Sequence, residues 1–198
     1  MSCGSKDLPR KFLQPKPNNS ISMLQSSKIL LRIPEPSDAA FMLAIENDER
    51  YWHLSNNQSP YSLADIEDFI RHSTANLLVD KQIRLVIVEQ STGEKAGLID
   101  LFEYDPIHSR VGTGMIITEP FRQRGLGIEA LRLIIRWLFD VVNVQQLWSN
   151  VLSNNEASMK LFKKAGFETT GVKKHWVYYQ NEYCDETFLQ LFNTKTTK

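Results

Sequence analysis

The spacing of hydrophobic and polar positions changes several times along the chain, and each spacing predicts a different kind of element. A short apolar run at 29–33 predicts a strand. Two stretches with apolar residues on one face predict helices. One begins near Ser37 and the other at Ser62, where an S-x-x-D pattern is typical of a capped helix start. The chain around Tyr51 and Trp52 shows neither spacing and is expected to be irregular.

The rest of the chain mixes strand and helix spacings. Apolar runs at 84–89, 95–103 and 111–118, joined by short polar connections, indicate three antiparallel strands. The elements expected after them are a helix following Gly127, a strand at 146–152, a helix at 155–165 and a hairpin of strands at 172–179 and 183–192. The order β-α-α-β-β-β-α-β-α-β-β predicts a mixed α/β (α+β) domain.

One ordered domain is expected at residues 28–192. The polar segment 1–27, which contains three prolines, is expected to be a flexible extension, and 193–198 a short tail. A chain of 198 residues is long enough for one domain with a hydrophobic core.

Composition is that of an ordinary soluble protein and argues against several function classes. Apolar residues make up 42% and charged residues 23%, and the formal net charge is zero, so we expect no nucleic-acid partner bound through bulk charge. No apolar stretch approaches the length of a membrane span, and the start has no apolar signal core. Cys3 and Cys184 show no spacing typical of a disulfide framework or a metal site. We therefore expect a cytoplasmic enzyme without a metal or a membrane partner.

A basic loop with two glycines, residues 122–127, lies between a predicted strand and a predicted helix. Backbone N–H groups are unpaired at a helix start, and the helix dipole favours negative charge there. Gly125 and Gly127 allow positive φ and close approach of a ligand, while Arg122 and Arg124 offer donors to phosphate oxygens. The loop fits neither G-x-G-x-x-G nor a Walker A motif. By itself it predicts an anion site or an ordinary strand–helix turn with solvated arginines.

Further motifs place this loop in a family. The residues R-Q-R-G-L-G at 122–127 match [QR]-x-x-G-x-[GA], the pyrophosphate loop of the GNAT superfamily of N-acetyltransferases. Residues 155–167 resemble that family's N-x-x-[AS]-x-x-[LI]-[YF]-x-x-x-G-F segment, and Leu31-Arg32 followed by Asp38 resembles its common opening. The resemblance covers residues 28–192. It extends to bacterial spermidine or diamine N-acetyltransferases, which have a segment similar to 97–110.

The resemblance implies a GNAT fold. It has a mixed central sheet of about six to seven strands, about four helices, and a splayed parallel pair, here 111–118 and 146–152. Acetyl-CoA would be the cosubstrate, with its pantetheine in the cleft between these strands and its pyrophosphate on the loop. The implied cofactor-binding residues are Ile116, Ile117, Thr118, Arg122, Gln123, Arg124, Gly125, Leu126, Gly127, Ile128, Asn155 and Ser158.

The implied reaction is direct transfer of the acetyl group from the thioester to an amine. An amine with a pKa of about 10.4 is protonated at neutral pH, so a base or a water chain must take its proton. The candidate bases are Asp100, Glu103 and His108. Asp100 and Glu103 are three residues apart in a predicted strand, which puts them on opposite faces unless a bulge intervenes. Each also fits a surface or ion-paired acid, and His108 an ordinary loop histidine.

One position departs from the family pattern. Many relatives carry a tyrosine that protonates the leaving thiolate where this chain has Phe162, and phenylalanine has no proton to donate. Ser158, one turn earlier in the predicted helix, is the expected substitute, as in some ribosomal-protein-type relatives. A small serine at a helix-packing position explains the same residue.

The expected acceptor is a primary amine, and the resemblance implies a polyamine such as spermidine. The candidate substrate-binding residues combine acids for ammonium groups with aromatic and imidazole rings, and are Glu46, Glu49, Tyr51, Trp52 and His108. A pair of solvated helix faces with an aromatic core edge also explains the acids and the aromatic residues. Two alternatives stay open, a ribosomal-type protein N-terminal acetyltransferase that acts on a peptide amine and a non-catalytic CoA-binding protein. Polyamine-acetylating relatives form oligomers, so we expect at least a dimer.

Overall fold

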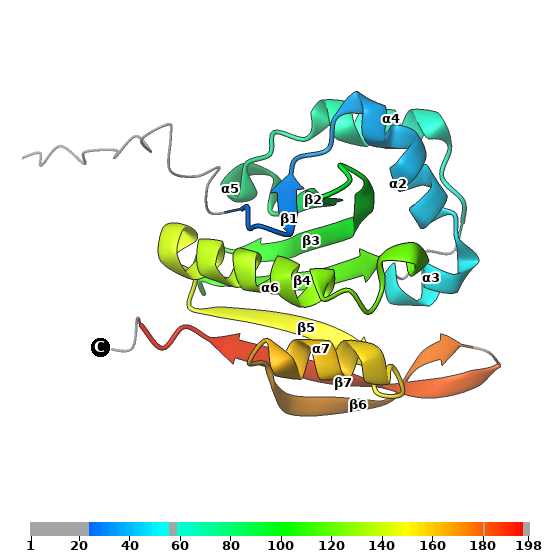
Figure 1. Ribbon diagram of the computed structural model, residues 1–198. Coiled ribbons are helices and arrows are strands. Elements are labelled where there is room, and N and C mark those ends of the chain that lie inside the picture. Colours follow the sequence, from blue (N-terminus) through cyan, green and yellow to red (C-terminus); the bar gives the residue numbers. More distant parts are fainter. Residues whose placement is uncertain (1–23, 56–58, 180, 196–198) are drawn as a thin grey trace, which may run out of the picture.

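In the computed structural model, the described residues are 24–55, 59–179 and 181–195, and they form a seven-stranded sheet with helices on both faces (Figure 1). The strands stand in the order β1-β2-β3-β4-β5-β7-β6, and β4 and β5 form the one parallel pair among them. The strands are β1 (Ile29–Arg32), β2 (Ile83–Glu89), β3 (Lys95–Asp105), β4 (Arg110–Ile117), β5 (Gln146–Leu152), β6 (Glu168–Tyr179) and β7 (Glu182–Phe192). The helices are η1 (Pro36–Asp38), α2 (Ala39–Glu46), α3 (Glu49–Ser55), α4 (Leu63–His72), α5 (Leu77–Asp80), η2 (Glu119–Phe121), α6 (Leu126–Trp137), η3 (Leu138–Val142) and α7 (Glu156–Lys164).

The two faces of the sheet carry different helices because neighbouring residues of a strand point to opposite sides. In β2, Ile87 packs in the cluster that contains the apolar stripe of α6, including Leu131, whereas Val86 packs with α2 and α4. Met42 of α2 and Ile66 of α4 belong to this second cluster. β2 is therefore buried on both faces, which explains its continuous apolar run in the sequence.

The expected order of strands and of the longer helices is confirmed, with ends that differ by a few residues. The capped start at Ser62 is present, since its hydroxyl accepts from the Asp65 N–H and the Asp65 carboxylate accepts from the Ser62 N–H. The expectation of irregular chain at Tyr51 and Trp52 is wrong, because both residues lie in α3. The four-residue helix α5 was also not expected, because one turn is too short to show a helical stripe.

Part of the expected N-terminal extension lies within the described residues. The carbonyl of Leu24 accepts a hydrogen bond from the N–H of Leu31 at 2.8 Å, and Gln25 forms a bridge with Leu30, so the chain turns back onto β1. Residues 1–23 and 196–198 lie outside the described residues. The flexible extension and the short tail therefore stay predictions.

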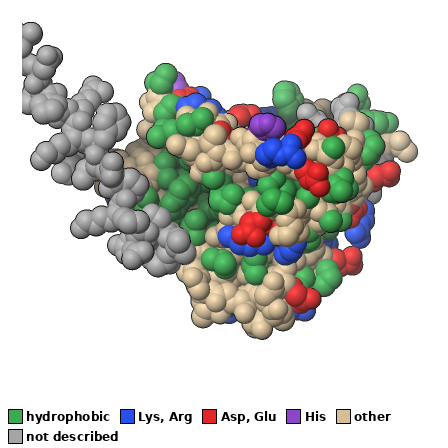
Figure 2. All heavy atoms as spheres, turned by 90° about the horizontal axis from the view of Figure 1, so that it is seen from above, with side chains coloured by type: hydrophobic (Ala, Val, Ile, Leu, Met, Phe, Trp, Pro, Cys, Tyr) green, Lys and Arg blue, Asp and Glu red, His purple; other side chains and the backbone are tan. Residues whose placement is uncertain are grey.

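On the face of the molecule shown in Figure 2, acidic and basic side chains are interspersed with hydrophobic ones. Within the part of the chain that the structure describes, no helix is long and apolar enough to span a membrane. The same residues contain no group of three or more histidine, cysteine or acidic side chains placed to hold a metal ion.

Candidate active site

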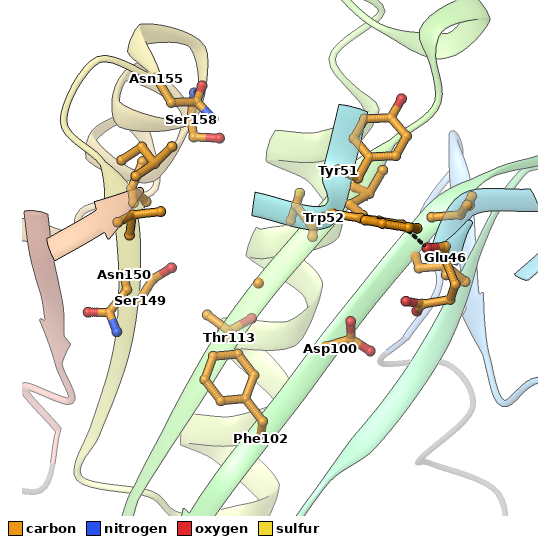
Figure 3. Close-up of a pocket in the computed structure, with 18 of the residues that line it drawn as sticks. Glu46, Tyr51, Trp52, Asp100, Phe102, Thr113, Ser149, Asn150, Asn155 and Ser158 are labelled. Atoms are coloured by element: carbon orange, nitrogen blue, oxygen red, sulfur yellow. Dashed lines mark hydrogen bonds between the residues drawn. The ribbon is translucent and has the colours of Figure 1, made fainter. Parts of the chain in front are cut away.

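β4 and β5 are paired only at one end, and their separation beyond it opens a cleft in the sheet. Arg110–Gly112 pairs with Gln146–Trp148, after which β4 continues to Ile117 and β5 to Leu152 without pairing to each other. β5 stays paired with β7 along its whole length. The cleft has a volume of about 1130 Å³. Figure 3 shows side chains of β4, β5, α3 and α7 around this cleft. The limited pairing of β4 with β5 confirms the expected splayed pair.

The point where the strands separate holds a buried hydroxyl group without a partner. Thr113 is the first residue of β4 beyond the pairing, and its Oγ1 has no hydrogen bond among the described residues. Ser149, the corresponding residue of β5, is also buried, and both residues line the cleft. Buried polar groups nearly always have partners. The wall of the cleft therefore fits a ligand with polar groups along its length, or water bound in its place.

The neighbouring part of β4 leads from the cleft to the basic loop. Ile116 lines the cleft, and Ile117 pairs with Gly97 of β3. Thr118 ends this stretch, where its N–H and its hydroxyl both donate to the carbonyl of Ala96, at 2.9 and 3.1 Å. The N–H of Thr118 is therefore directed toward β3, and β4 reaches the loop with its other edge unpaired.

The loop between η2 and α6 has the backbone shape of an anion site. Gly125 is the N-cap of α6 with φ 79°, and Gln123 also has a positive φ of 60°. A Cβ added at Gly125 would meet nothing within 4 Å, so the backbone conformation, and not a lack of space, requires glycine there. The hydrogen bond from Glu129 N to Gly125 O starts the helix. The N–H groups of Leu126–Ile128 therefore lie at the positive end of the helix dipole without a partner inside the helix.

The two arginines of the loop are partly engaged by the protein. Arg122 donates through Nε to Ile117 O at 3.0 Å and through Nη2 to the hydroxyl of Tyr51 at 2.9 Å. Arg124 Nη1 lies 3.3 Å from the carboxylate of Glu89, and its guanidinium lies 5.0 Å from the ring centre of Phe121. A guanidinium has five N–H donors, so each arginine keeps donors that suit a phosphate.

The N-terminal part of α7 borders the cleft opposite α3 (Figure 3). Asn155 caps this helix, with its Oδ1 accepting from the N–H of Ser158 at 3.1 Å, and both residues line the cleft. Phe162 lines the same wall. It is buried and packs edge-on against Phe167, with ring centres 5.0 Å apart. The fold therefore brings Asn155, Ser158 and Phe162 together as the sequence predicts.

The acidic end of the cleft contains an arginine that sequence analysis missed. Arg84 of β2 binds Asp100 of β3 through two hydrogen bonds, Nε to Oδ1 at 2.7 Å and Nη2 to Oδ2 at 3.1 Å. Its Nη1 donates to Glu46 at the end of α2. Burial by itself lowers the pKa of Arg84, but the two carboxylates raise that pKa by a larger amount. The net effect is a raised pKa, so the guanidinium stays charged. A lone arginine in the buried run R-L-V-I-V was the available signal, because a buried charge needs partners.

Glu103 reaches the cleft because of a bulge. The register between β3 and β4 shifts between Phe102 and Asp105, and Glu103 has a positive φ of 50°. Asp100 and Glu103 therefore both line the cleft. Their spacing of three residues in a strand permits this only if a bulge lies between them. His108 lies exposed in the connection between β3 and β4 and is not a lining residue. Its N–H donates to Asp105 at 3.0 Å, and the structure does not bring its side chain to the other candidates.

The aromatic candidates enter the cleft from α3. Trp52 donates through Nε1 to the carbonyl of Glu46 at 2.8 Å, which ties α3 to the end of α2 (Figure 3). Tyr51 is buried and lines the cleft, and Glu49 is exposed at its edge. Trp176 of β6 lines the cleft as well and was not anticipated, because it lies within a register shift of the last hairpin, between Lys173 and Val177, that the sequence does not reveal.

Comparisons with known proteins agree with this architecture. Residues 28–168 match the family model described as acetyltransferase (GNAT) domain. The curated spermidine N(1)-acetyltransferase of Escherichia coli K12 is 28% identical over 173 residues, which cover 86% of this chain and 89% of that protein. The spermidine N(1)-acetyltransferase of Vibrio cholerae is 21% identical over 174 residues, 86% of this chain and 96% of that one. The solved structure of spermidine N-acetyltransferase from Vibrio cholerae with CoA and spermine has a TM-score of 0.77 at 19% identity, over 86% and 98% of the two chains.

A mixed sheet with a splayed parallel pair, next to a glycine-containing basic loop at a helix start, is the arrangement that the resemblance to coenzyme A-dependent acyltransferases implied. The family model covers most of the chain, and the chain belongs to the GNAT acetyltransferase family. The expected fold, the enzyme class of N-acetyltransferase and the cosubstrate acetyl-CoA are confirmed at this level.

Proposed function

We propose that this enzyme transfers the acetyl group of acetyl-CoA to a primary amine of a polyamine such as spermidine. The observation that supports this most is the acidic end of the cleft. Glu46, Glu49, Asp100 and Glu103 line it, with the aromatic rings of Tyr51 and Trp52 beside them. Carboxylates and aromatic faces are the groups that bind ammonium ions. Curated relatives from Escherichia coli and Vibrio cholerae are named spermidine N(1)-acetyltransferases, and one solved neighbour is described as a complex with CoA and spermine.

Acetyl-CoA fits the other end of the cleft. The amides of Gln123–Ile128, with Arg122 and Arg124, would hold the pyrophosphate, because positive φ at two loop positions and an open helix start suit an anion. Ile116, Ile117 and Thr118 would place the pantetheine along the unpaired edge of β4, and Asn155 and Ser158 would approach it from α7. Acetyl-CoA supplies the acetyl group as a thioester.

The acids of the cleft would divide two tasks between them. The carboxylate of Asp100 is bound by Arg84 through both oxygens, so it suits a fixed negative charge better than a mobile proton acceptor. Glu103 lies at the bulge and is exposed, and we assign it the acceptance of the proton of the attacking amine, directly or through water. The hydroxyl of Ser158 is the candidate proton donor to the leaving sulfur, since Phe162 has none. His108 has no assigned role.

The test measures release of the CoA thiol against a panel of putrescine, spermidine, spermine and peptides with free N-termini. We expect release with the polyamines, and Glu103→Gln to lower kcat more than it raises KM. Glu182→Gln is the matched control, because Glu182 is an exposed acid of β7 that does not line the cleft. Turnover of peptides but not of polyamines would refute the proposed acceptor, and an absence of turnover with every amine would refute catalysis.

We also propose that the enzyme is a homo-oligomer, at least a dimer. The support is one solved neighbour described as dodecameric, from Vibrio cholerae, with a TM-score of 0.72 over 87% of this chain. Light scattering behind a sizing column measures the mass directly, and a mass of one chain, 22.8 kDa, would refute the proposal. The cytoplasmic location stays a prediction.

A further inference from the structure

Arg84 places a fixed positive charge in the part of the cleft that the proposed function assigns to ammonium groups. Its side chain is 21% exposed, and those of its partners Glu46 and Asp100 are 11% and 31% exposed. Its guanidinium lies over the ring of Phe69 of α4, 5.6 Å from the ring centre. Two carboxylates and one aromatic face therefore hold the guanidinium on three sides, and an arginine does not lose its proton near neutral pH.

The charge of this group differs from what its acids alone suggest. Two carboxylates and one guanidinium leave a net charge of −1, whereas Glu46 and Asp100 by themselves would supply −2. The other basic residue in the lining, Lys173 of β6, is paired with Glu186 of β7 at 2.6 Å. Glu49, Asp65 and Glu103 also line the cleft, but they are exposed, so solvent and salt screen their charges more strongly.

The positive charge that an amine acceptor keeps after its reacting nitrogen has lost a proton must match the net charge of −1 of Arg84, Glu46 and Asp100. Putrescine then keeps one ammonium group, spermidine two and spermine three. The first ammonium group is attracted by the net charge of −1. A second one brought to the same place meets a neutralised carboxylate pair and the guanidinium itself, and this repulsion is strong in a partly buried site.

We propose that Arg84 is a specificity-determining residue that restricts this end of the cleft to a single ammonium group. The proposal rests on the function proposed above and refines its substrate class to amines with one ammonium group near the reacting nitrogen. Arg84 acts through the carboxylates that it neutralises and takes no part in the acetyl transfer.

The experiment compares amines of different charge within each variant. Calorimetric binding of spermine and putrescine to the CoA-loaded protein gives a ratio of affinities, and kcat/KM gives a second ratio. Arg84→Gln should raise the spermine-to-putrescine ratio by about tenfold, and make it fall more steeply with salt, because a site with one more negative charge favours the amine with more positive charges. Asp100→Asn keeps Arg84 and removes a negative charge, so it should lower the ratio.

Three controls separate charge from folding. Arg84→Lys keeps the positive charge and should keep the wild-type ratio. Arg84→Gln combined with Asp100→Asn restores the net charge of −1 and should return the ratio to its wild-type value. Arg71→Gln removes an exposed arginine of α4 that does not line the cleft and should leave the ratio unchanged. Thermal unfolding of each variant shows that it is folded.

The outcomes are distinct. An unchanged ratio in folded Arg84→Gln, or an equal change in Arg84→Lys, overturns the role of Arg84. If Arg84→Gln does not fold, Asp100→Asn decides by the direction of its change, and a ratio that stays the same or rises overturns the proposal. Failure of the wild-type protein to bind any amine refutes the polyamine function itself, and the role of Arg84 with it.

Discussion

Replacing Gly125 with alanine separates backbone strain from cosubstrate binding. Gly125 has φ 79°, and a Cβ there would meet no atom within 4 Å, so alanine introduces no steric contact with the rest of the protein. An alanine in the left-handed region costs about 1–2 kcal/mol. The smaller freedom of alanine in the unfolded chain returns about 0.4–1 kcal/mol of this. The free energy of unfolding should therefore fall by about 1 kcal/mol, equivalent to about 2–4 °C in Tm.

Gly93 provides a matched control in the same chain. It has φ 74° in the turn between β2 and β3, again with nothing within 4 Å of an added Cβ, and it is not part of the loop 122–127. Gly93→Ala should lose the same stability as Gly125→Ala. Only Gly125→Ala should weaken CoA binding, because relief of its strain moves the loop amides. Loss of one hydrogen bond to a phosphate, about 1.5–3 kcal/mol, raises the Kd roughly tenfold to a hundredfold.

Thermal unfolding and calorimetric titration with CoA measure the two quantities on the same samples. The reasoning is refuted if Gly125→Ala loses the stability expected of both variants and still binds CoA as the wild type does. A similar weakening of CoA binding in Gly93→Ala would show that general destabilisation, and not the loop, determines the Kd.

Three further predictions concern other parts of the molecule. Burial raises the pKa of Asp38, but hydrogen bonds from Arg32, the Glu35 N–H and Lys95 outweigh it and hold that pKa well below its usual value. The stability that this lowered pKa contributes is present above about pH 4 and is lost as the pH falls through the lowered pKa. Asp38→Asn should therefore weaken the dependence of urea unfolding on acid pH. It should also lower the free energy of unfolding by about 3 kcal/mol at neutral pH. Thr113→Val should leave stability equal or up to about 1 kcal/mol higher, and should raise the KM for acetyl-CoA. Ser158→Ala should lower kcat roughly tenfold with KM unchanged, because a leaving thiol of pKa about 8.5 needs only modest acid catalysis. Adding Phe162→Tyr to the Ser158→Ala variant should restore kcat, because the tyrosine hydroxyl can donate the proton.

Each of these predictions has a contrary result. An Asp38→Asn protein that keeps the wild-type acid dependence would show that other carboxylates determine it. An unchanged KM in Thr113→Val would mean that the orphan hydroxyl of Thr113 binds water and not the cosubstrate. Wild-type turnover in Ser158→Ala would remove Ser158 from the proton transfer.

The order of the elements and the anion-site shape of the loop 122–127 were predictable because the information is local. The period of apolar residues gives the strands and helices, and the positive φ at Gly125 is required within the same six-residue loop that carries the arginines. The helices α3 and α5 were not predicted, because a short helix has too few turns to show a stripe of apolar residues. In α3 the adjacent aromatic residues Tyr51 and Trp52 stand where such a stripe would be expected.

The ion pairs at the acidic end of the cleft could not be predicted because they depend on pairings between distant strands. Whether Glu103 shares a side of β3 with Asp100 depends on a register shift against β4, which the spacing of the two acids does not reveal. Likewise, Arg84 is 38 residues from Glu46 and 16 from Asp100 in the chain, and their ion pairs exist only once β2, β3 and α2 are assembled. An inventory of acids in the sequence therefore overestimates the negative charge offered to an amine. The net charge of such a site has to be counted from the ion pairs of the folded chain. Selectivity among amines depends on this net charge, whereas acetylation of an amine does not, so a measurement of selectivity tests the structure more sharply.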